Sequence, residues 1–484
     1  MSANRPAAVV VLAAGEGTRM KSATPKVLHS ICGRSLVGHV VTASRELDPE
    51  HLVVVVGHAR DQVRAHLAEI DPDVRTAVQH EQNGTGHAVR MGLEELSDSG
   101  VTLDGTVIVV CGDTPLLTGD TLTALAATHA ADGNAVTVLS AEVPDATGYG
   151  RIVRGDDGAV TEIVEHKDAS DEQRRIREIN SGVFAFDAQL LADALGKVRT
   201  DNSQGEEYLT DVLGILREAG HRVGASVADD HREILGINNR VQLAEARRLL
   251  NARLLERAML DGVTVVDPAS TWVDATVTFE PDATVHPGTQ LMGGTHLAAG
   301  AQVGPHSRLT DTTVGEGAVV SFTVAEGARI GVGASVGPYA YLRPGTDLGP
   351  KAKAGTYVEM KNATIGEGTK VPHLSYVGDA TIGEYTNIGA ASVFVNYDGE
   401  TKHHTTIGSH CKTGSDNMFV APVTVGDGAY TAAGSVITKD VPPGSLAVAR
   451  GQQRNIEGWV ARKRPGSAAA QAASAARQET DGAH

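Results

Sequence analysis

The sequence is poor in cysteine, in aromatic residues and in positive charge. Its 484 residues include only three cysteines, Cys32, Cys111 and Cys411, which lie far apart and show no CxxC spacing. An odd number of separated cysteines argues against both a disulfide framework and a cysteine-based zinc site. We therefore expect a protein of the reducing cytoplasm.

Lysine and arginine are outnumbered by acidic residues, 42 to 59, and the formal net charge is −17. A chain of this charge without a basic stripe repels a phosphate backbone, so no nucleic-acid partner is expected. Long hydrophobic runs are also missing, because the apolar stretch near the N-terminus is only about nine residues long and too short to span a bilayer. It also lacks the basic opening of a signal peptide, so we interpret it as a buried first strand and expect no membrane partner.

The first half of the chain contains short aliphatic runs that alternate with helix-like stretches. The runs are Ala8 to Leu12, Leu52 to Val56, Val107 to Val110 and Ala135 to Leu139. Such runs, separated by helical connections, predict a Rossmann-like, mostly parallel α/β sheet. Ligands of these sheets bind outside the carboxyl ends of the strands, where candidate site residues are expected.

A helix is predicted over residues 239–262, because Leu243, Leu250, Leu254 and Met259 are spaced for one helical face. After it, apolar residues recur every six positions. One unbroken series runs Val273, Phe279, Val285, Leu291, Leu297, Val303 and Leu309, and further series begin at Val324, Ile365 and Ile407.

A period of six fits neither a helix nor an ordinary strand. Glycine follows the apolar residue repeatedly, as in Val303-Gly304 and Ile330-Gly331. This pattern predicts a left-handed parallel β-helix of hexapeptide repeats, in which small residues form the corners. The narrow interior and tight corners account for the 4% aromatic content and the 55 glycines.

The polar segment at residues 396–404, NYDGETKHH, interrupts the repeats and predicts a loop that leaves the coil. These patterns divide the chain into an α/β domain at 1–238, a linker helix at 239–262 and a β-helix domain at 263–460. The remaining tail, 461–484, is rich in alanine and serine and has no apolar face, so we expect it to be disordered.

A glycine-rich turn follows the first strand. The segment from Leu12 to Met20, LAAGEGTRM, fits neither GxxxxGK[ST] nor GxGxxG. A glycine-rich turn of this kind still exposes backbone N–H groups that can bind phosphate, and Arg19 and Lys26 add positive charge near the same turn. From spacing alone, a phosphate-binding turn and an ordinary turn both remain open.

Motifs along nearly the whole chain resemble one enzyme family. The glycine-rich turn with Pro25-Lys26 resembles the nucleotide-binding signature of sugar-nucleotide pyrophosphorylases, and GTGHA, GDTPL, GYGRI, VEHKDA and INSG follow in the family's order. In the second half, PHLSYVGDA and VNYDG resemble acetyltransferase motifs. Together they are similar to the bifunctional N-acetylglucosamine-1-phosphate uridyltransferase/glucosamine-1-phosphate acetyltransferase family. Cys111 and Asn83 are small departures that remove no required charge.

The resemblance implies a UTP and sugar site in the first half. UTP contacts are expected from Leu12, Ala13, Ala14, Gly15, Lys26, Gln79, Gly84, Thr85, Cys111, Gly112 and Asp113. Sugar contacts are expected from Gly150, Glu165, Asn180 and Asn238. Lys26 and Arg19 are the implied catalytic cations, and Asp113 with Asn238 is the implied Mg²⁺ site.

The resemblance implies an acetyl-transfer site in the second half, with His373 as the general base. From position alone, His373 and an ordinary surface histidine are not distinguished. Substrate contacts are expected from Arg343, Lys361, Tyr376 and Asn387. Acetyl-CoA contacts are expected from Ala390, Ser415, Ala433 and Arg450, with Asn396 and Tyr397 of the inserted loop close by. The family also implies a homotrimer with shared acetyl sites.

The function implied by the resemblance is acetylation of glucosamine 1-phosphate followed by uridyl transfer from UTP, which yields UDP-N-acetylglucosamine for bacterial cell-wall precursor synthesis. One alternative is a single-function pyrophosphorylase with a purely structural β-helix. Another is a non-catalytic scaffold. A single-function pyrophosphorylase does not require the PHLSY and NYDG motifs, so their presence argues against it. A non-catalytic scaffold is expected to have lost site residues, whereas Lys26, Asp113, Asn238 and His373 are all present.

Overall fold

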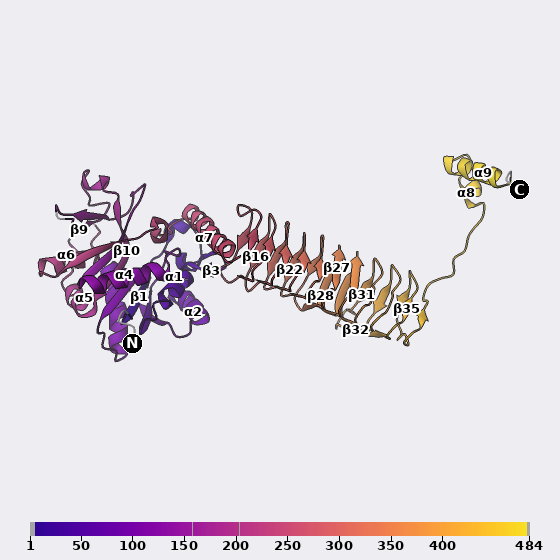
Figure 1. Ribbon diagram of the computed structural model, residues 1–484, viewed down its shortest axis with the longest axis horizontal. Coiled ribbons are helices and arrows are strands. Elements are labelled where there is room, and N and C mark those ends of the chain that lie inside the picture. The colour runs from indigo at the N-terminus through magenta and orange to yellow at the C-terminus, as the bar shows by residue number, and fades with distance from the viewer. Residues whose placement is uncertain (1–4, 157, 203, 482–484) are drawn as a thin grey trace. The chain divides into compact units, whose positions relative to one another are not determined.

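The computed structural model describes residues 5–156, 158–202 and 204–481 (Figure 1). By their internal contacts, the residues divide into two compact units, 1–317 and 318–484. The boundary falls within the hexapeptide repeats, whereas the period of the sequence changes near residue 263.

The first repeats belong to unit 1 because they bond directly to the part that precedes them. The backbone N–H of Ala275 donates to the Cys32 carbonyl at 2.9 Å. Asn251 donates from its side-chain amide to the Thr271 carbonyl and accepts from the backbone N–H of Val273. These bonds join the start of the repeats to the long helix and to the α/β part.

Unit 1 contains a nine-stranded mixed sheet in its described residues, with the central order β11-β7-β10-β6-β1-β4-β5. Strand β10 runs antiparallel between β6 and β7, and β1, β4, β5 and β6 are parallel. The four predicted aliphatic runs all lie in this sheet. The strands are β1 (Ala8–Ala13), β4 (His51–Val56), β5 (Arg75–Val78), β6 (Thr106–Cys111), β7 (Val136–Glu142), β8 (Arg151–Arg154), β9 (Val160–Val164), β10 (Glu178–Asp187) and β11 (Val223–Val227).

Helices cover both faces of this sheet (Figure 1). Val9 and Val11 of β1 share a core with residues of α1 and α4, and Val10 shares another with residues of α3, α5 and α6. Burial on both faces explains why β1 is apolar without alternation. The helices are α1 (Leu36–Arg45), α2 (Arg60–Ile70), α3 (Thr85–Asp98), α4 (Gly119–Asp132), α5 (Ala188–Leu195) and α6 (Asp211–Glu218), with 3₁₀ turns η1 (Thr18–Met20), η2 (Lys26–Leu28), η3 (Gln173–Arg175) and η4 (His231–Ile234) and a hairpin of β2 (Ser30–Ile31) and β3 (Arg34–Ser35).

The predicted linker helix is α7, Arg240–Leu260. Leu243 and Leu250 are buried as predicted, but Met259 is 39% exposed and Ala258 is buried in its place. The predicted Leu254 is only partly buried, and Leu255 is the buried leucine of that turn. Ala258 follows Leu255 by three positions and lies on the same helical face.

The repeats of unit 1 form coils of parallel strands. Val285 pairs with Val303 and Leu291 with Leu309, each 18 residues further along the chain, so three six-residue steps complete one coil. The four side chains are fully buried inside the coil. The strands are β12 (Thr264–Val265), β13 (Trp272–Val273), β14 (Thr278–Phe279), β15 (Thr284–Val285), β16 (Gln290–Met292), β17 (His296–Leu297), β18 (Gln302–Val303), β19 (Arg308–Thr310) and β20 (Thr313–Val314).

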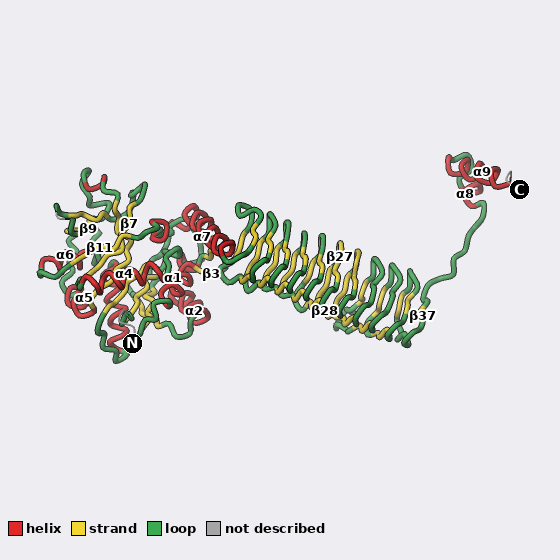
Figure 2. The backbone as a smooth tube through the Cα atoms, viewed as in Figure 1, coloured by secondary structure: helices red, strands yellow, loops and turns green. Residues whose placement is uncertain are grey.

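Unit 2 continues the same pattern of short strands and turns (Figure 2). Together with the hexapeptide spacing, it is consistent with the left-handed parallel β-helix predicted from the sequence. Its strands are β21 (Val319–Val320), β22 (Val324–Glu326), β23 (Arg329–Ile330), β24 (Ser335–Val336), β25 (Tyr341–Leu342), β26 (Thr346–Leu348), β27 (Lys353–Thr356), β28 (Glu359–Ile365), β29 (Lys370–His373), β30 (Tyr376–Ile382), β31 (Val393–Val395), β32 (Thr405–Ile407), β33 (Met418–Val420), β34 (Val423–Val425), β35 (Tyr430–Thr431), β36 (Val436–Ile437) and β37 (Leu446–Ala447).

Two expectations for unit 2 need correction. Val324 does not point inward, because Ala325 is the fully buried residue of β22 and the step from Val320 is five residues, not six. The tail contains helices α8 (Trp459–Lys463) and α9 (Ala468–Asp481) where disorder was expected. Alanine has the highest helix propensity, so an alanine-rich segment can form helices without an apolar face. Residues 482–484 of the tail lie outside the described residues.

None of the helices in the described part of the chain combines the length and the hydropathy needed to cross a bilayer.

Candidate active sites

The glycine-rich turn after β1 brings Lys26 to the carboxyl end of the sheet. Gly17 has φ +66°, and a Cβ there would lie 2.4 Å from the Cβ of Lys26, so only glycine allows the two segments to approach. At the neighbouring strand end, the backbone N–H of Gly112 donates to the Leu12 carbonyl at 2.9 Å. The turn after β1 and the turn after β6 are thereby held side by side.

Four predicted residues meet at this edge. Lys26 Nζ lies 2.5 Å from Asp113 Oδ2 and 3.3 Å from Asn238 Oδ1. Arg19 donates to the same Asn238 oxygen at 2.9 Å. The backbone N–H of Ile237 donates to the Asp113 carbonyl at 2.9 Å and fixes the two segments to each other.

The arrangement of Asp113 and Asn238 fits a divalent cation of the Mg²⁺ type. Both side chains direct an oxygen to the same point, which the Lys26 ammonium occupies here. Mg²⁺ prefers oxygen ligands and commonly takes one or two from the protein, with water and phosphate oxygens completing its shell. Among the described residues no group of three or more His, Cys, Asp or Glu could hold a metal.

Two adjoining cavities open beside this cluster. The first has a volume of about 290 Å³ and the second about 220 Å³, and they share Leu12, Thr85 and Cys111 in their linings. The first contains most residues predicted for UTP, namely Leu12, Ala13, Ala14, Gly15, Lys26, Gln79, Gly84, Thr85, Cys111 and Asp113. The second contains Gly150, Glu165 and Asn180, which were predicted for the sugar. Gly112 and Asn238 line neither cavity and contribute through the contacts above.

The side chains in these cavities have distinct electrostatic environments. Burial, followed by the charges of Asp168 and Asp211, raises the pKa of Glu165 above its ordinary value. Burial, followed by the charge of Asp113, raises the pKa of the Cys111 thiol to about 12. Cys111 therefore stays protonated at neutral pH and is no nucleophile.

Four lining residues of the nucleotide cavity were not predicted from the sequence: the apolar Val27 and Ala88 and the polar Gln82 and Glu206. Glu206 lies in the lining, and Gln82 lines the cavity while donating to the Ala14 carbonyl at 3.0 Å. The adjacent Glu207 accepts the backbone N–H of Gly86 at 2.8 Å through its carbonyl. An acidic pair is not expected in a pocket for a phosphate compound, so residue chemistry gave no reason to select the segment at 204–208.

In unit 2, three cationic side chains gather around neighbouring strands. Arg343 follows β25, Lys361 lies in β28, and Lys402 comes from the inserted loop. Lys402, followed by the charge of Arg343, lowers the pKa of Lys361 below its ordinary value. Arg343 is paired with Glu359 at 2.8 Å. The cluster carries more positive than negative charge at close range and suits an anionic ligand such as a phosphate.

The inserted loop is bonded to the strand that begins with Tyr376. Asn396 donates from its side chain to Asp379 Oδ2 at 2.5 Å and lies 3.4 Å from the Tyr376 hydroxyl. Tyr397 and Lys402 form a backbone bridge that closes the loop. Lys402 and Asp379 were not predicted from the sequence, although a lysine in an inserted polar loop was a usable signal.

His373 begins a row of residues at one corner of successive coils. Its carbonyl accepts the backbone N–H of Ala391, and the Ala390 carbonyl accepts that of Asp416. The next coil repeats this contact from Gly434 to the Ser415 carbonyl. Arg450 then donates to the Ala433 carbonyl at 2.9 Å, so the five predicted residues His373, Ala390, Ser415, Ala433 and Arg450 follow one line.

Asn387 forms isolated parallel bridges with Lys370 and Lys412. Lys370 begins β29, the strand that ends at His373, so Asn387 lies on the β-helix face that contains β29.

Comparisons with known proteins agree with both halves. Residues 9–179 match the MobA-like NTP transferase domain, and residues 404–439 match the bacterial transferase hexapeptide family. The chain is 83% identical to the bifunctional protein GlmU of Streptomyces avermitilis over the full length of both chains. It is 65% identical to that of Thermobifida fusca over 99% of each chain, and 59% identical to that of Corynebacterium glutamicum over 97% of each. The family predicted from the motifs is thus confirmed, and the chain belongs to the GlmU family of bifunctional proteins.

Proposed function

We propose that the chain catalyses two consecutive reactions on separate sites: acetyl transfer from acetyl-CoA to glucosamine 1-phosphate, and uridyl transfer from UTP to the resulting N-acetylglucosamine 1-phosphate. The products are UDP-N-acetylglucosamine and pyrophosphate, for use in bacterial cell-wall precursor synthesis in the cytoplasm. We assign uridyl transfer to residues 1–238, acetyl transfer to 263–460, and a connecting role to the helix at 239–262.

The pair of adjoining cavities in unit 1 carries the proposal for uridyl transfer. One is lined by the glycine-rich turn and Lys26, which suit a nucleoside triphosphate, and the other by Glu165 and Asn180, which suit sugar hydroxyls. The shared lining allows the sugar phosphate oxygen to approach the α-phosphorus of UTP. Such a transfer depends on alignment and charge neutralisation rather than on a covalent nucleophile.

Charge at the phosphates is supplied by the chain itself. Lys26 and Arg19 present cationic groups at the mouth of the nucleotide cavity. Mg²⁺, held by Asp113 and Asn238, supplies further neutralisation of the triphosphate when bound. Lys26 then exchanges its bond to Asp113 for bonds to phosphate oxygens.

The cation cluster of unit 2 supports the proposal for acetyl transfer. Arg343, Lys361 and Lys402 bind the phosphate of glucosamine 1-phosphate, and Tyr376 and Asn387 contact the sugar. His373 removes the proton from the sugar amine as the nitrogen attacks the thioester carbonyl; the C–S bond then breaks, and the departing CoA thiolate takes up the proton from His373. Acetyl-CoA lies along the row of Ala390, Ser415, Ala433 and Arg450, close to Asn396 and Tyr397.

We also propose a homotrimer. Val393, Met418 and Val436 are 36–44% exposed and occupy the outward position of paired strands β31, β33 and β36. An apolar row of this kind on a flat β-helix face suits contact with a second copy. In such a trimer, each acetyl site would be shared between the coils of neighbouring copies.

The test is an omission assay with the purified protein. Glucosamine 1-phosphate, acetyl-CoA, UTP and Mg²⁺ together should give UDP-N-acetylglucosamine and pyrophosphate, and omission of any one should stop product formation. When N-acetylglucosamine 1-phosphate replaces glucosamine 1-phosphate, acetyl-CoA should become unnecessary. Formation of a UDP-sugar from glucosamine 1-phosphate without acetyl-CoA would instead support the single-function pyrophosphorylase.

A further inference from the structure

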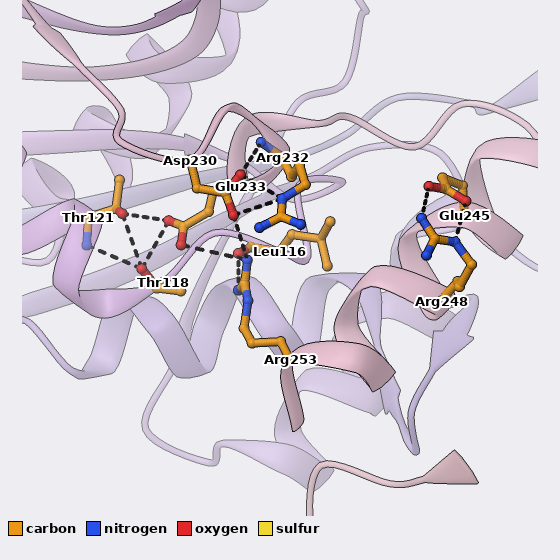
Figure 3. A network of polar contacts seen from close by, with 9 residues as sticks. All are labelled: Leu116, Thr118, Thr121, Asp230, Arg232, Glu233, Glu245, Arg248 and Arg253. Carbon is orange, nitrogen blue, oxygen red and sulfur yellow. Dashed lines mark hydrogen bonds and ion pairs between the residues drawn. The ribbon is translucent and has the colours of Figure 1, made fainter. Parts of the chain in front are cut away.

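A partly buried ionic network connects helix α7 to the turn that follows Asp113 (Figure 3). Arg253 of α7 donates through Nη1 to the Leu116 carbonyl at 2.8 Å. Its Nη2 lies 3.6 Å from Glu233 Oε1 and 3.9 Å from Asp230 Oδ2. One guanidinium therefore contacts the segment after Asp113 and the segment before Asn238.

Glu233 also bonds to the beginning of helix α4. Its side chain is 12% exposed, and Oε2 accepts hydrogen bonds from the hydroxyls of Thr118 at 3.0 Å and Thr121 at 2.5 Å. Thr118 is the N-cap of α4 and accepts the backbone N–H of Thr121. The 3₁₀ turn that contains Glu233 is thus bonded to the beginning of α4.

The two segments joined by this network are the ones that carry the oxygens of the candidate cation site. Asp113 begins the turn that reaches Leu116, and Asn238 follows Glu233 by five residues. At the site itself, the two segments share the bond from the Ile237 N–H to the Asp113 carbonyl. The network braces the same pair of segments from the other end.

The long helix makes this brace rigid. Asn238 directly precedes the N-cap of α7, and Arg253 lies about 20 Å further along the helix axis, at 1.5 Å per residue. Helix α7 thus begins just after Asn238, and its Arg253 side chain contacts the turn that follows Asp113. A shift of one segment against the other must therefore break bonds of Arg253 or Glu233.

We propose that Arg253, through Glu233, is a positioning residue for uridyl transfer. It sets the separation of the Asp113 and Asn238 oxygens and thereby tunes binding of the divalent cation and alignment of the triphosphate. Arg253 touches neither substrate nor cation and acts only through the two segments. The inference rests on the proposed uridyl transfer, whereas the contacts that form the brace are observed whatever reaction the chain catalyses.

The same helix offers a matched control. Arg248 lies five residues before Arg253 and pairs only with Glu245 of its own helix in the network drawn in Figure 3. The pair is exposed, with 60% and 51% of the side chains accessible. Arg248→Met removes one arginine from α7, as Arg253→Met does, but leaves the brace untouched.

Hydrogen exchange of the full-length, metal-free protein tests the brace directly. In Arg253→Met, we expect the Ile237 amide to exchange at least about tenfold faster than in the unaltered protein and in Arg248→Met. Arg253→Lys keeps the charge but loses the forked geometry, so we expect an intermediate rate. Equal exchange of Ile237 in Arg253→Met and Arg248→Met would overturn the proposal.

Uridyl transfer and acetyl transfer are then measured on the same preparations. For Arg253→Met, we expect the Mg²⁺ concentration for half-maximal uridyl transfer to rise and kcat to fall about 10- to 100-fold, as for small displacements of reacting groups. Acetyl transfer should be unchanged. Equal loss of both activities would show general damage and overturn a positioning role, with Arg253→Lys deciding the matter if Arg253→Met does not fold. If the unaltered protein lacks uridyl transfer, the proposed function fails, whereas the exchange result still reports on the brace.

Discussion

Lys26 Nζ lies 2.5 Å from Asp113 Oδ2, and both side chains are largely buried, at 13% and 20% exposed. The ammonium thus occupies the position in which the Asp113 and Asn238 oxygens converge. A bound divalent cation and a bound triphosphate would take over both halves of this ion pair. The ion pair compensates two largely buried charges within the chain.

The first prediction concerns Asp113. Asp113→Ala removes one of the two oxygens and leaves Lys26 without its partner, so we expect uridyl transfer to fall by at least about 10²-fold. Acetyl transfer, assigned to the other half, should remain. The measurement is a separate assay of each reaction, with Asp120→Ala on exposed α4 surface as the control. Equal loss of both activities would show damage to the fold.

Much of the architecture was predictable because its cause is local. The change of period near residue 263 follows from which side chains point into a narrow coil, and this information is present in every hexapeptide. The slip at Val324 shows where local information ends. Whether Val324 or Ala325 points inward depends on a shortened turn, which no apolar spacing reveals.

The residues of the candidate sites also differ in how far local sequence information could identify them. Residue chemistry suggested Lys26 as a phosphate-binding cation, because a glycine-rich turn and a lysine follow one strand, but it left an ordinary turn open and the UTP role came from the resemblance. His373 gained its role only from resemblance. Lys402 and Arg253 were not predicted, because their importance depends on contacts with Lys361 and Glu233 across 41 and 20 residues of chain.

The second prediction is a pH dependence of sugar binding at Glu165. Burial raises the pKa of this carboxyl group, so it protonates at a higher pH than a free glutamate. The ionised form is the better acceptor for sugar hydroxyls, and we expect KM for N-acetylglucosamine 1-phosphate to rise as the pH falls through the raised pKa. Glu165→Gln should raise KM at neutral pH and flatten this dependence. A profile that is the same in both proteins would exclude Glu165 as the titrating group.

The third prediction concerns Lys402. Because Lys402 lowers the pKa of Lys361, its replacement by methionine should return that pKa toward the ordinary value. Lys361 then keeps its charge to higher pH, so the alkaline weakening of glucosamine 1-phosphate binding should shift upward. At neutral pH, loss of one cation from the cluster should raise KM for glucosamine 1-phosphate by about tenfold.

These effects are measured as KM against pH for acetyl transfer alone. Lys439→Met is the matched control, since Lys439 is an exposed lysine of the same unit that follows β36. An unshifted alkaline limb in Lys402→Met would contradict the coupling between the two ammonium groups.

The final prediction assigns the general base. His373 ends β29 and is exposed at the start of the row that leads to Arg450, so its imidazole is accessible to a substrate amine at that corner. His373→Ala should lower kcat for acetyl transfer by at least about 10²-fold, the usual effect of losing a general base, and leave uridyl transfer unchanged. His404→Ala removes another exposed histidine of unit 2, one that contacts Thr381, and should leave both activities intact. Because a base acts on the amine and not on the phosphate, KM for glucosamine 1-phosphate should change little in His373→Ala. A large rise in KM with an unchanged kcat would instead assign His373 to substrate binding.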